Sequence, residues 1–181
     1  MTDNEIFELI RVVNSSELTI DFRSIYEEAF PPDERREWSQ ITELLNNPDF
    51  RLEGIYIQKR LVGMISFWKL HGFEFIEHFA IQKNEQGKGY GSRTIQQIIS
   101  ERKTTIVLEV EESINETAQK RIAFYKQFNF HLCDLEYFQP PYSADKKKIR
   151  MRLMSYPDQI QNENFASIKA EIYSSVYGIC E

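Results

Sequence analysis

The stretch "KNEQGKGYGSRTI", residues 83–95, constrains the fold more than any other part of the chain. Gly87, Gly89 and Gly91 stand at alternate positions between a strand-like run and a run with helical spacing. A second strand-like run, "TTIVLEVE", follows that helix. Because a strand–helix–strand crossover favours parallel pairing, we expect a sheet that changes from antiparallel to parallel near its middle.

Strand and helix patterns alternate along the rest of the chain without a long linker or a repeat. Before the glycine stretch, strands are expected at "IFELIRVV", "RLEGIYI", "LVGMISFWKL" and "GFEFIEHFAIQ", with two amphipathic helices after the first. After it, two strands are expected at "FHLCDLEYF" and "KKIRMRLMS". The fold class is therefore α+β, with a mixed, twisted seven-stranded sheet flanked by helices.

Two further helices follow from apolar residues at helical spacing. The first ends with Asn129, which suits a left-handed C-terminal position, and it carries Ile114, Ala118, Ile122, Tyr125 and Phe128. The second is an additional C-terminal helix that carries Phe165, Ile168, Ile172, Val176 and Ile179.

Composition bounds the function. The chain is 41% hydrophobic and 28% charged, without a long uncharged apolar run or a signal-peptide pattern, so we expect a cytoplasmic protein with no membrane contact. A formal charge of −6 argues against nucleic acid as a partner. Cys133 and Cys180 are expected to be free thiols. His71, His78 and His131 show no ligand spacing, so no metal is expected.

The glycines stand where a helix N-terminus presents free N–H groups and a dipole that attracts anions. Without Cβ atoms they let a phosphate touch the main chain. The spacing fits neither a Walker A loop nor the Rossmann fingerprint, which needs a third glycine where Ser92 stands. The simpler alternative is a flexible strand-to-helix turn.

At these residues the chain resembles the GNAT superfamily of acyl-CoA-dependent N-acetyltransferases. The motif Gln or Arg, two residues, Gly, one residue, Gly or Ala is matched by Gln86, Gly89 and Gly91. The "EHFAI" strand and the "RIAFYKQFNF" segment also look like family counterparts. The resemblance implies acetyl-CoA as cosubstrate, a GNAT domain over residues 1–155, and a helical extension over 156–181 that packs on the same domain or on a partner subunit, as in a homodimer.

The resemblance also implies how the coenzyme is held. Backbone amides of the loop would bind its pyrophosphate, and the pantetheine arm would pair with a strand as an extra strand does. Arg121 stands where many members have Ala and could reach a phosphate. The implied cofactor-binding residues are Phe79, Ala80, Ile81, Gln86, Gly87, Lys88, Gly89, Tyr90, Gly91, Ser92 and Arg121.

Glu77 is the candidate general base. Strict alternation puts it on one strand face with Phe75, Phe79 and Ile81, where desolvation would raise its pKa. The structural alternative is a carboxylate paired with a nearby cation. Glu109 and Glu111 are the reserve candidates for the base.

Tyr125 is the candidate general acid. It matches the family tyrosine thought to protonate the departing thiolate, although it also lies on the apolar face of its helix and could be a core residue.

The predicted function is direct transfer of an acetyl group from acetyl-CoA to the primary amine of a small molecule. Acidic residues on the strands expected to flank the cleft favour a cationic acceptor. Phe30, Trp68, Glu109 and Tyr142 are its candidate contacts. The alternatives are a non-catalytic acyl-CoA-binding regulatory module and an acetyltransferase acting on a protein or aminoacyl-tRNA amine.

Overall fold

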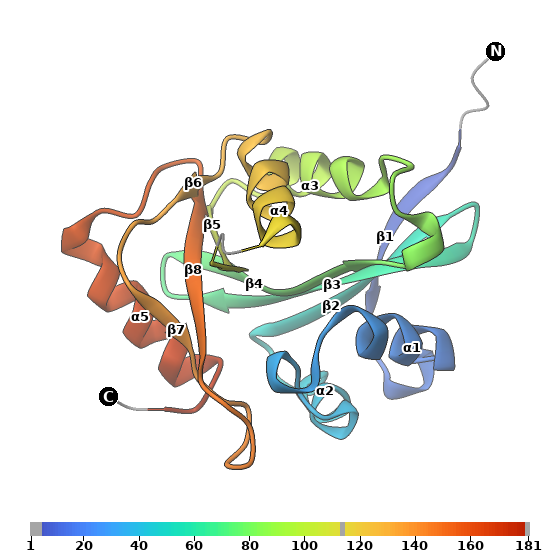
Figure 1. The fold of residues 1–181 in the computed structure, drawn as a ribbon. Helices are drawn as coiled ribbons and strands as arrows, with labels where there is room; N and C mark the ends of the chain where they lie inside the picture. Colours follow the sequence, from blue (N-terminus) through green and yellow to red (C-terminus); the bar gives the residue numbers. More distant parts are fainter. Residues whose placement is uncertain (1–4, 113–114, 180–181) are drawn as a thin grey trace. The chain divides into compact units, whose positions relative to one another are not determined.

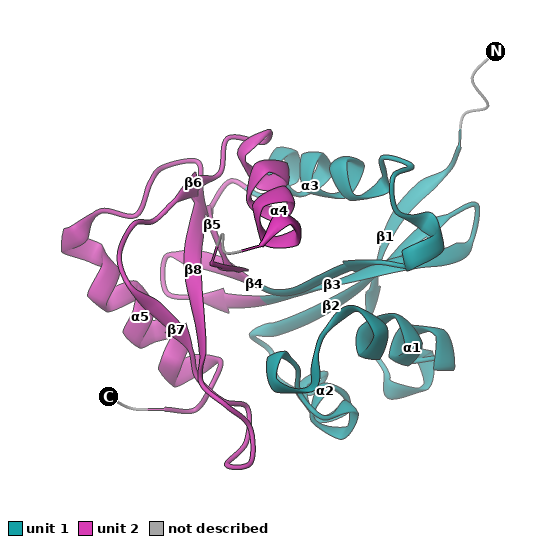
Figure 2. Cartoon of the chain, in the orientation of Figure 1, with its two compact units in different colours: residues 1–67, 77–102 teal, residues 68–76, 103–181 magenta. Residues whose placement is uncertain are grey.

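The computed structural model describes residues 5–112 and 115–179, which form two compact units (Figure 2). Unit 1 contains residues 1–67 and 77–102, and unit 2 contains residues 68–76 and 103–181. Strands β3 (Arg60–Leu70) and β4 (Phe73–Ile81) each run from one unit into the other. The strand order is β1-β2-β3-β4-β5-β8-β6, with β7 paired to β8.

Unit 1 places helices on both faces of its strands. Strand β1 (Phe7–Val12) pairs antiparallel with β2 (Phe50–Ile57). Figure 1 shows α1 (Ile20–Ala29) and α2 (Trp38–Leu44) on one face of these strands and α3 (Tyr90–Glu101) on the other. Each strand face is therefore covered by an amphipathic helix, which removes the apolar side chains from water.

Unit 2 contains the change of strand direction. The first part of β4 pairs parallel with β5 (Thr105–Glu111), and β5 pairs antiparallel with β8 (Ile149–Tyr156). Strands β6 (His131–Leu132) and β7 (Tyr137–Gln139) both pair antiparallel with β8. The predicted mixed α+β sheet is confirmed.

The helices of unit 2 begin and end at recognisable signals. The side chain of Asn115 caps α4 (Glu116–Lys126) by accepting from the N–H of Ala118 at 2.8 Å. Asn129 has a φ of 62°, so its predicted left-handed conformation is confirmed. Helix α5 (Asn162–Ser175) is the predicted C-terminal helix. None of the helices within the described ranges is long and apolar enough to cross a membrane.

Three details differ from the prediction. The single strand expected over residues 130–138 is interrupted between β6 and β7. At the interruption, Arg152 Nε donates a hydrogen bond to the Cys133 carbonyl at 2.8 Å. The last helix stops before Ile179, because Gly178 turns left-handed with a φ of 69°. Ile114 and Cys180 lie outside the described residues, while Cys133 is a free, buried thiol.

Candidate active site

The glycine segment connects β4 to α3, and its backbone has a shape that favours glycine. Gly87 and Gly89 have φ values of 78° and 84°, and Gly89 is the N-cap of α3. A Cβ added at either would meet no heavy atom within 4 Å, so open space lies beside both Cα atoms. Gly91 and Ser92 form the first turn, where helix N–H groups have no intrahelical acceptor. This helix end can bind an anion through its main chain.

Polar side chains fix the segment at its start. The Gln86 amide donates to the Ile81 carbonyl at 3.0 Å, which ties the loop to the end of β4. The buried Glu85 carboxylate accepts from Arg60 at 2.5 Å and from Lys88 at 2.9 Å. These hydrogen bonds lower the pKa of Glu85 to about 2, and the one from Arg60 has the larger effect. The Gln86 side chain is thus engaged within the loop, while Lys88 remains about half exposed.

Side chains at the end of β4 belong to the core. Phe79 and Ile81 pack on a buried cluster beneath α3 that includes Tyr90, whose hydroxyl donates to Glu5 at 3.0 Å. Ala80 is buried, and its carbonyl oxygen would lie 2.5 Å from a Cβ added at Gly63, so only glycine allows this close approach of β3. Phe79 and Ile81 are only partly buried, so some of their surface remains accessible at this end of β4.

Glu77 is paired with a cation. Its carboxylate accepts from Arg36 Nε at 2.8 Å, and the two side chains are 0% and 9% exposed. The second carboxylate oxygen lies 3.7 Å from His78 Nδ1. The structure therefore matches the ion-paired alternative for Glu77.

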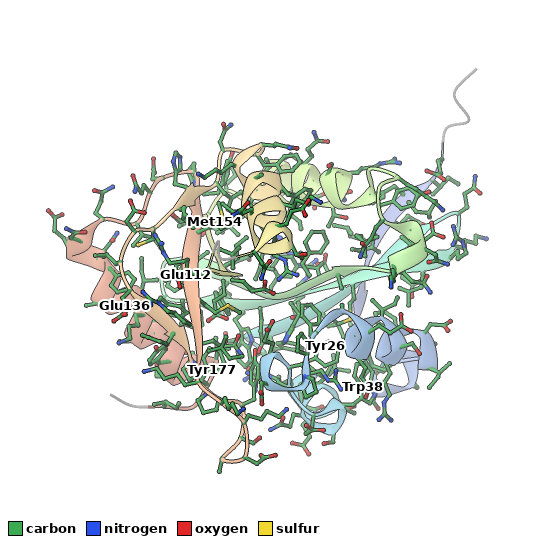
Figure 3. All side chains as sticks on the ribbon, in the orientation of Figure 1. Tyr26, Trp38, Glu112, Glu136, Met154 and Tyr177 are labelled. Atoms are coloured by element: carbon green, nitrogen blue, oxygen red, sulfur yellow. The ribbon has the colours of Figure 1, made fainter. Side chains whose placement is uncertain are left out.

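A polar network surrounds this pair. The Tyr26 hydroxyl accepts the Arg36 backbone N–H at 2.8 Å and lies 3.4 Å from His78 Nε2. Burial, and next the charge of Glu77, raise the pKa of Tyr26. The Tyr26 ring also lies 5.7 Å from that of Trp38 (Figure 3). These residues from α1, α2 and the intervening loop hold the Glu77 side chain in one position.

Strict alternation fails along β4. Glu77 and His78 are consecutive, yet both side chains contact the segment 26–36. Ile81 packs with Tyr90 of α3, which lies on the other face of the unit 1 strands (Figure 1). The expectation that Glu77 shares a face with Ile81 is therefore wrong. An interruption of this kind is typical of a β-bulge, which re-aims a side chain.

The main chain of Glu77 is accessible. The residue is partly exposed, although its side chain is 0% exposed, so the accessible surface of Glu77 is main chain. Backbone groups that face solvent in a strand can accept an extended ligand as an additional strand. Together, the anion-binding turn before α3 and the accessible main chain of Glu77 could hold an elongated molecule.

Tyr125 lies on α4 in unit 2 and is 6% exposed. Its ring lies 5.5 Å from that of Phe130. Burial raises the pKa of Tyr125 to about 12, and the charge of Arg121 acts in the opposite direction. The phenol is therefore protonated at neutral pH, as a proton donor must be, while its ring is part of the core.

Arg121 is engaged in an ion pair. Its guanidinium lies 3.2 Å from the Glu111 carboxylate, and both side chains are partly exposed. Glu112 is paired in a similar way with Arg150 at 3.2 Å. Two of the carboxylates expected to attract a cationic acceptor are thus compensated by arginine.

Glu109 is held by phenols. Its carboxylate accepts hydrogen bonds from the hydroxyls of Tyr137 on β7 and of Tyr177 after α5, the latter at 3.1 Å and 2.9 Å to its two oxygens. Burial, followed by the charge of Glu109, raises the pKa of Tyr137 well above its ordinary value. The half-buried Glu109 therefore accepts from two phenol donors.

The aromatic candidates differ in exposure. The Phe30 ring lies 4.7 Å from His78 and is partly exposed. Tyr142 is partly exposed and stacks at 5.1 Å on Tyr177. Trp68 is 3% exposed and therefore belongs to the core. Among residues 5–112 and 115–179, no three His, Cys, Asp or Glu side chains gather as a metal site would require.

The sequence did not predict the hydrogen-bond partners of Glu77 and Glu109. Arg36 stands 41 residues from Glu77, and Tyr177 stands 68 residues from Glu109. No pattern in the sequence relates Arg36 to the strand that carries Glu77. No pattern in the sequence relates Tyr177 to a strand so distant along the chain.

The family model described as the Acetyltransferase (GNAT) family matches residues 16–130. Among solved structures, the chain is similar to a protein from Bacteroides thetaiotaomicron assigned to the same family, with 30% identity and a TM-score of 0.87, covering 96% of this chain and 99% of that one. No curated protein sequence matches the chain.

More distant structures share the fold. The ribosomal-protein-S18-alanine N-acetyltransferase from Escherichia coli is 15% identical with a TM-score of 0.62, covering 88% of this chain and 99% of that one. A GNAT family acetyltransferase from Elizabethkingia anophelis, solved with acetyl-CoA bound, is 14% identical with a TM-score of 0.59, covering 85% of this chain and 98% of that one.

Proposed function

The chain belongs to the GNAT family of acetyltransferases, and from this premise we propose that it transfers an acetyl group from acetyl-CoA directly to the primary amine of a small molecule. The observation that carries the proposal is the turn before α3, where two left-handed glycines open the helix N-terminus to an anion. A coenzyme pyrophosphate is such an anion.

In this proposal the coenzyme binds through main-chain groups. The amides of residues 86–92 hold the pyrophosphate, and the pantetheine arm pairs with the backbone of residues 79–81. The accessible main chain of Glu77 supports this assignment, because it continues the same strand. In this proposal strand N–H groups stabilise the oxyanion that forms during transfer. Arg121 contributes to phosphate binding only if it exchanges the Glu111 carboxylate for a phosphate.

Transfer needs one base and one acid. Glu77 accepts a proton from the acceptor's ammonium group through a water molecule, because its carboxylate is 0% exposed and cannot meet the acceptor directly. The free amine then attacks the thioester carbon, the carbon–sulfur bond breaks, and Tyr125 gives its phenol proton to the departing sulfur. The Tyr125 phenol is protonated at neutral pH, as a proton donor must be, although burial raises its pKa to about 12 and so makes it a weaker acid. No covalent enzyme intermediate forms.

The acceptor in this proposal is a small ammonium compound. Phe30 and Tyr142 are partly exposed rings that attract cations, and Glu109 supplies a carboxylate. Trp68 is a core residue, so in this proposal it supports the acceptor site by packing and not by direct contact. Glu111 and Glu112 contribute less to the attraction of a cation, because each is already paired with an arginine.

The test is a panel of small amines offered to the chain with acetyl-CoA, followed by release of free thiol and by mass spectrometry of the acetylated product. The proposal expects one amide formed for each thiol released. Tight binding of coenzyme A without turnover on any amine would instead support a non-catalytic acyl-CoA-binding module.

A further inference from the structure

Strand β1 is an edge strand of the sheet and lies in unit 1. In the described part of the chain, β2 is the strand that pairs with it. The Gln58 N–H donates to the Ile6 carbonyl at 2.9 Å, so the backbone of residue 6 faces β2, as do the even-numbered residues that follow. The N–H and C=O groups of Phe7, Leu9 and Arg11 therefore point to the open side of β1, where another strand could pair with them.

Contacts within unit 1 close this open side at both of its ends. At the start, Arg93 of α3 donates to the Glu5 carbonyl at 3.2 Å and 3.3 Å. At the far end, the Val13 N–H donates to the Glu17 carboxylate at 3.3 Å. The stretch between these contacts holds three outward-facing residues and is symmetric about Leu9.

Exposed apolar side chains gather at the same strand. Among the described residues, the large hydrophobic side chains that are exposed belong to Ile6, Ile10, Val13 and Ile20, at 59%, 44%, 57% and 74%. Ile6 and Ile10 share one strand face by alternation, and Val13 directly follows β1. Apolar side chains grouped on a surface mark sites where another molecule binds.

We propose that a second copy of this chain pairs with β1, antiparallel and about a two-fold axis at Leu9. The axis sets residue 9 opposite its own counterpart and Phe7 opposite Arg11 of the partner subunit, so each open N–H meets an open carbonyl. Moving the axis by one or two residues sets one of the three outward residues opposite Glu5 or Val13, whose groups are already engaged. The inference concerns assembly and does not depend on the proposed acetyl transfer.

The side chains suit this pairing. On one face Leu9 packs against its own counterpart. On the other face Ile10 lies diagonal to its counterpart and Ile6 lies opposite Val12, so exposed apolar surface is removed from water. No like charges stand opposite each other, because Glu8 faces an isoleucine.

The competing explanation is an edge that stays in water, protected by the charges of Glu8 and Arg11. The two explanations differ in the oligomeric state of the chain. Because a pair of six-residue strands is a small interface, the dimer is expected to be weak and to form in the micromolar range.

Sedimentation of the full chain from about 1 to 200 µM should show the mass rising from one chain to two and no further, because a two-fold pairing closes. Ile10→Lys brings two ammonium groups together and should weaken the dimer about ten-fold or more. Ile20→Lys is the matched control, since it makes the same change at an exposed residue outside β1, and it should shift the dissociation constant less than about two-fold. A mass of one chain throughout, a mass rising past two, or equal effects of the two lysine variants would overturn the inference.

Cysteine cross-linking tests the register of the pairing. In a Cys180→Ser background, Leu9→Cys sets two thiols opposite each other with Cα atoms about 5.5 Å apart, which a disulfide can bridge. Arg11→Cys is the control, because its counterpart would lie about 14 Å further along the strand. Mild oxidation should therefore cross-link Leu9→Cys far more than Arg11→Cys, although Arg11 is the more exposed residue. Equal cross-linking, or the reverse order, would overturn the inference.

Discussion

The two units hold their important carboxylates by different chemistry. In unit 1, Glu77 and Glu85 are buried side chains, each held by arginine. In unit 2, the partly exposed Glu109 is held by the hydroxyls of two tyrosines. An ion pair in a buried position compensates a charge that would otherwise be costly, whereas a phenol is a neutral hydrogen-bond donor. The comparison teaches that unit 1 buries its two carboxylates beside arginine, while Glu109 of unit 2 is partly exposed.

The largest expected effect follows from breaking the buried pair. Arg36→Met would leave the Glu77 carboxylate buried without its guanidinium, which should lower the free energy of unfolding by about 3 kcal/mol or more. Arg121→Met removes an ion pair whose side chains are partly exposed and should cost about 1 kcal/mol or less. Urea denaturation of the two variants measures both values. Equal losses of unfolding free energy in the two variants would contradict the difference between the buried and the partly exposed ion pair.

Tyr125→Phe tests the acid in unit 2. The ring stays in the core and only the proton donor is deleted, so kcat should fall about a hundred-fold while the free energy of unfolding barely changes. Tyr156→Phe is the control, because its ring lies 5.5 Å from Phe130 in the same aromatic stack. A drop in melting temperature with unchanged kcat would make Tyr125 a structural residue.

The glycine turn of unit 1 offers a matched pair of variants. Gly89 and Gly72 both have a φ of 84° and open space where a Cβ would stand. Substitution by valine should destabilise the chain similarly at either position, by roughly 1 to 3 kcal/mol, through backbone strain. Calorimetry with coenzyme A should show at least a ten-fold loss of affinity for Gly89→Val only. The same affinity in both variants would exclude the turn from the coenzyme site.

The smallest effects concern pH. The pKa of Glu85, lowered from 4.5 to about 2, means that its share of the stability is complete above pH 4.5 and is lost as the pH falls toward 2. The pKa of Tyr125, raised from 10.0 to about 12, means that its share is complete below pH 10 and is lost as the pH rises through 12. Glu85→Gln should flatten the acid side of the stability profile and Tyr125→Phe the alkaline side. Unchanged profiles would contradict the two assignments.

Local patterns explain what the sequence predicted well. The order of elements, the glycine turn and the left-handed Asn129 depend on residues close together in the chain. The setting of Glu77 depends instead on where the loop before α2 lies, and on a break in the alternation of side chains along β4 that the sequence periodicity does not reveal. The partners of Glu109 come from β7 and from the turn after α5, so they appear only once the chain has folded.

The domain boundary after residue 155 and the roles of the individual site residues remain predictions. Helix α5 does pack within unit 2, because Tyr173 and Tyr177 contact β7 and β5. This packing agrees with an extension that rests on its own domain.

Steady-state kinetics of Glu77→Gln and Glu109→Gln on one small amine test the central claim most directly. If the buried carboxylate is the base and the exposed one binds the ammonium, Glu77→Gln should lower kcat by about a hundred-fold or more, with little change in the KM for the amine. Glu109→Gln should raise that KM about ten-fold with kcat preserved. The opposite assignment, or the same parameter changed in both variants, would contradict the account.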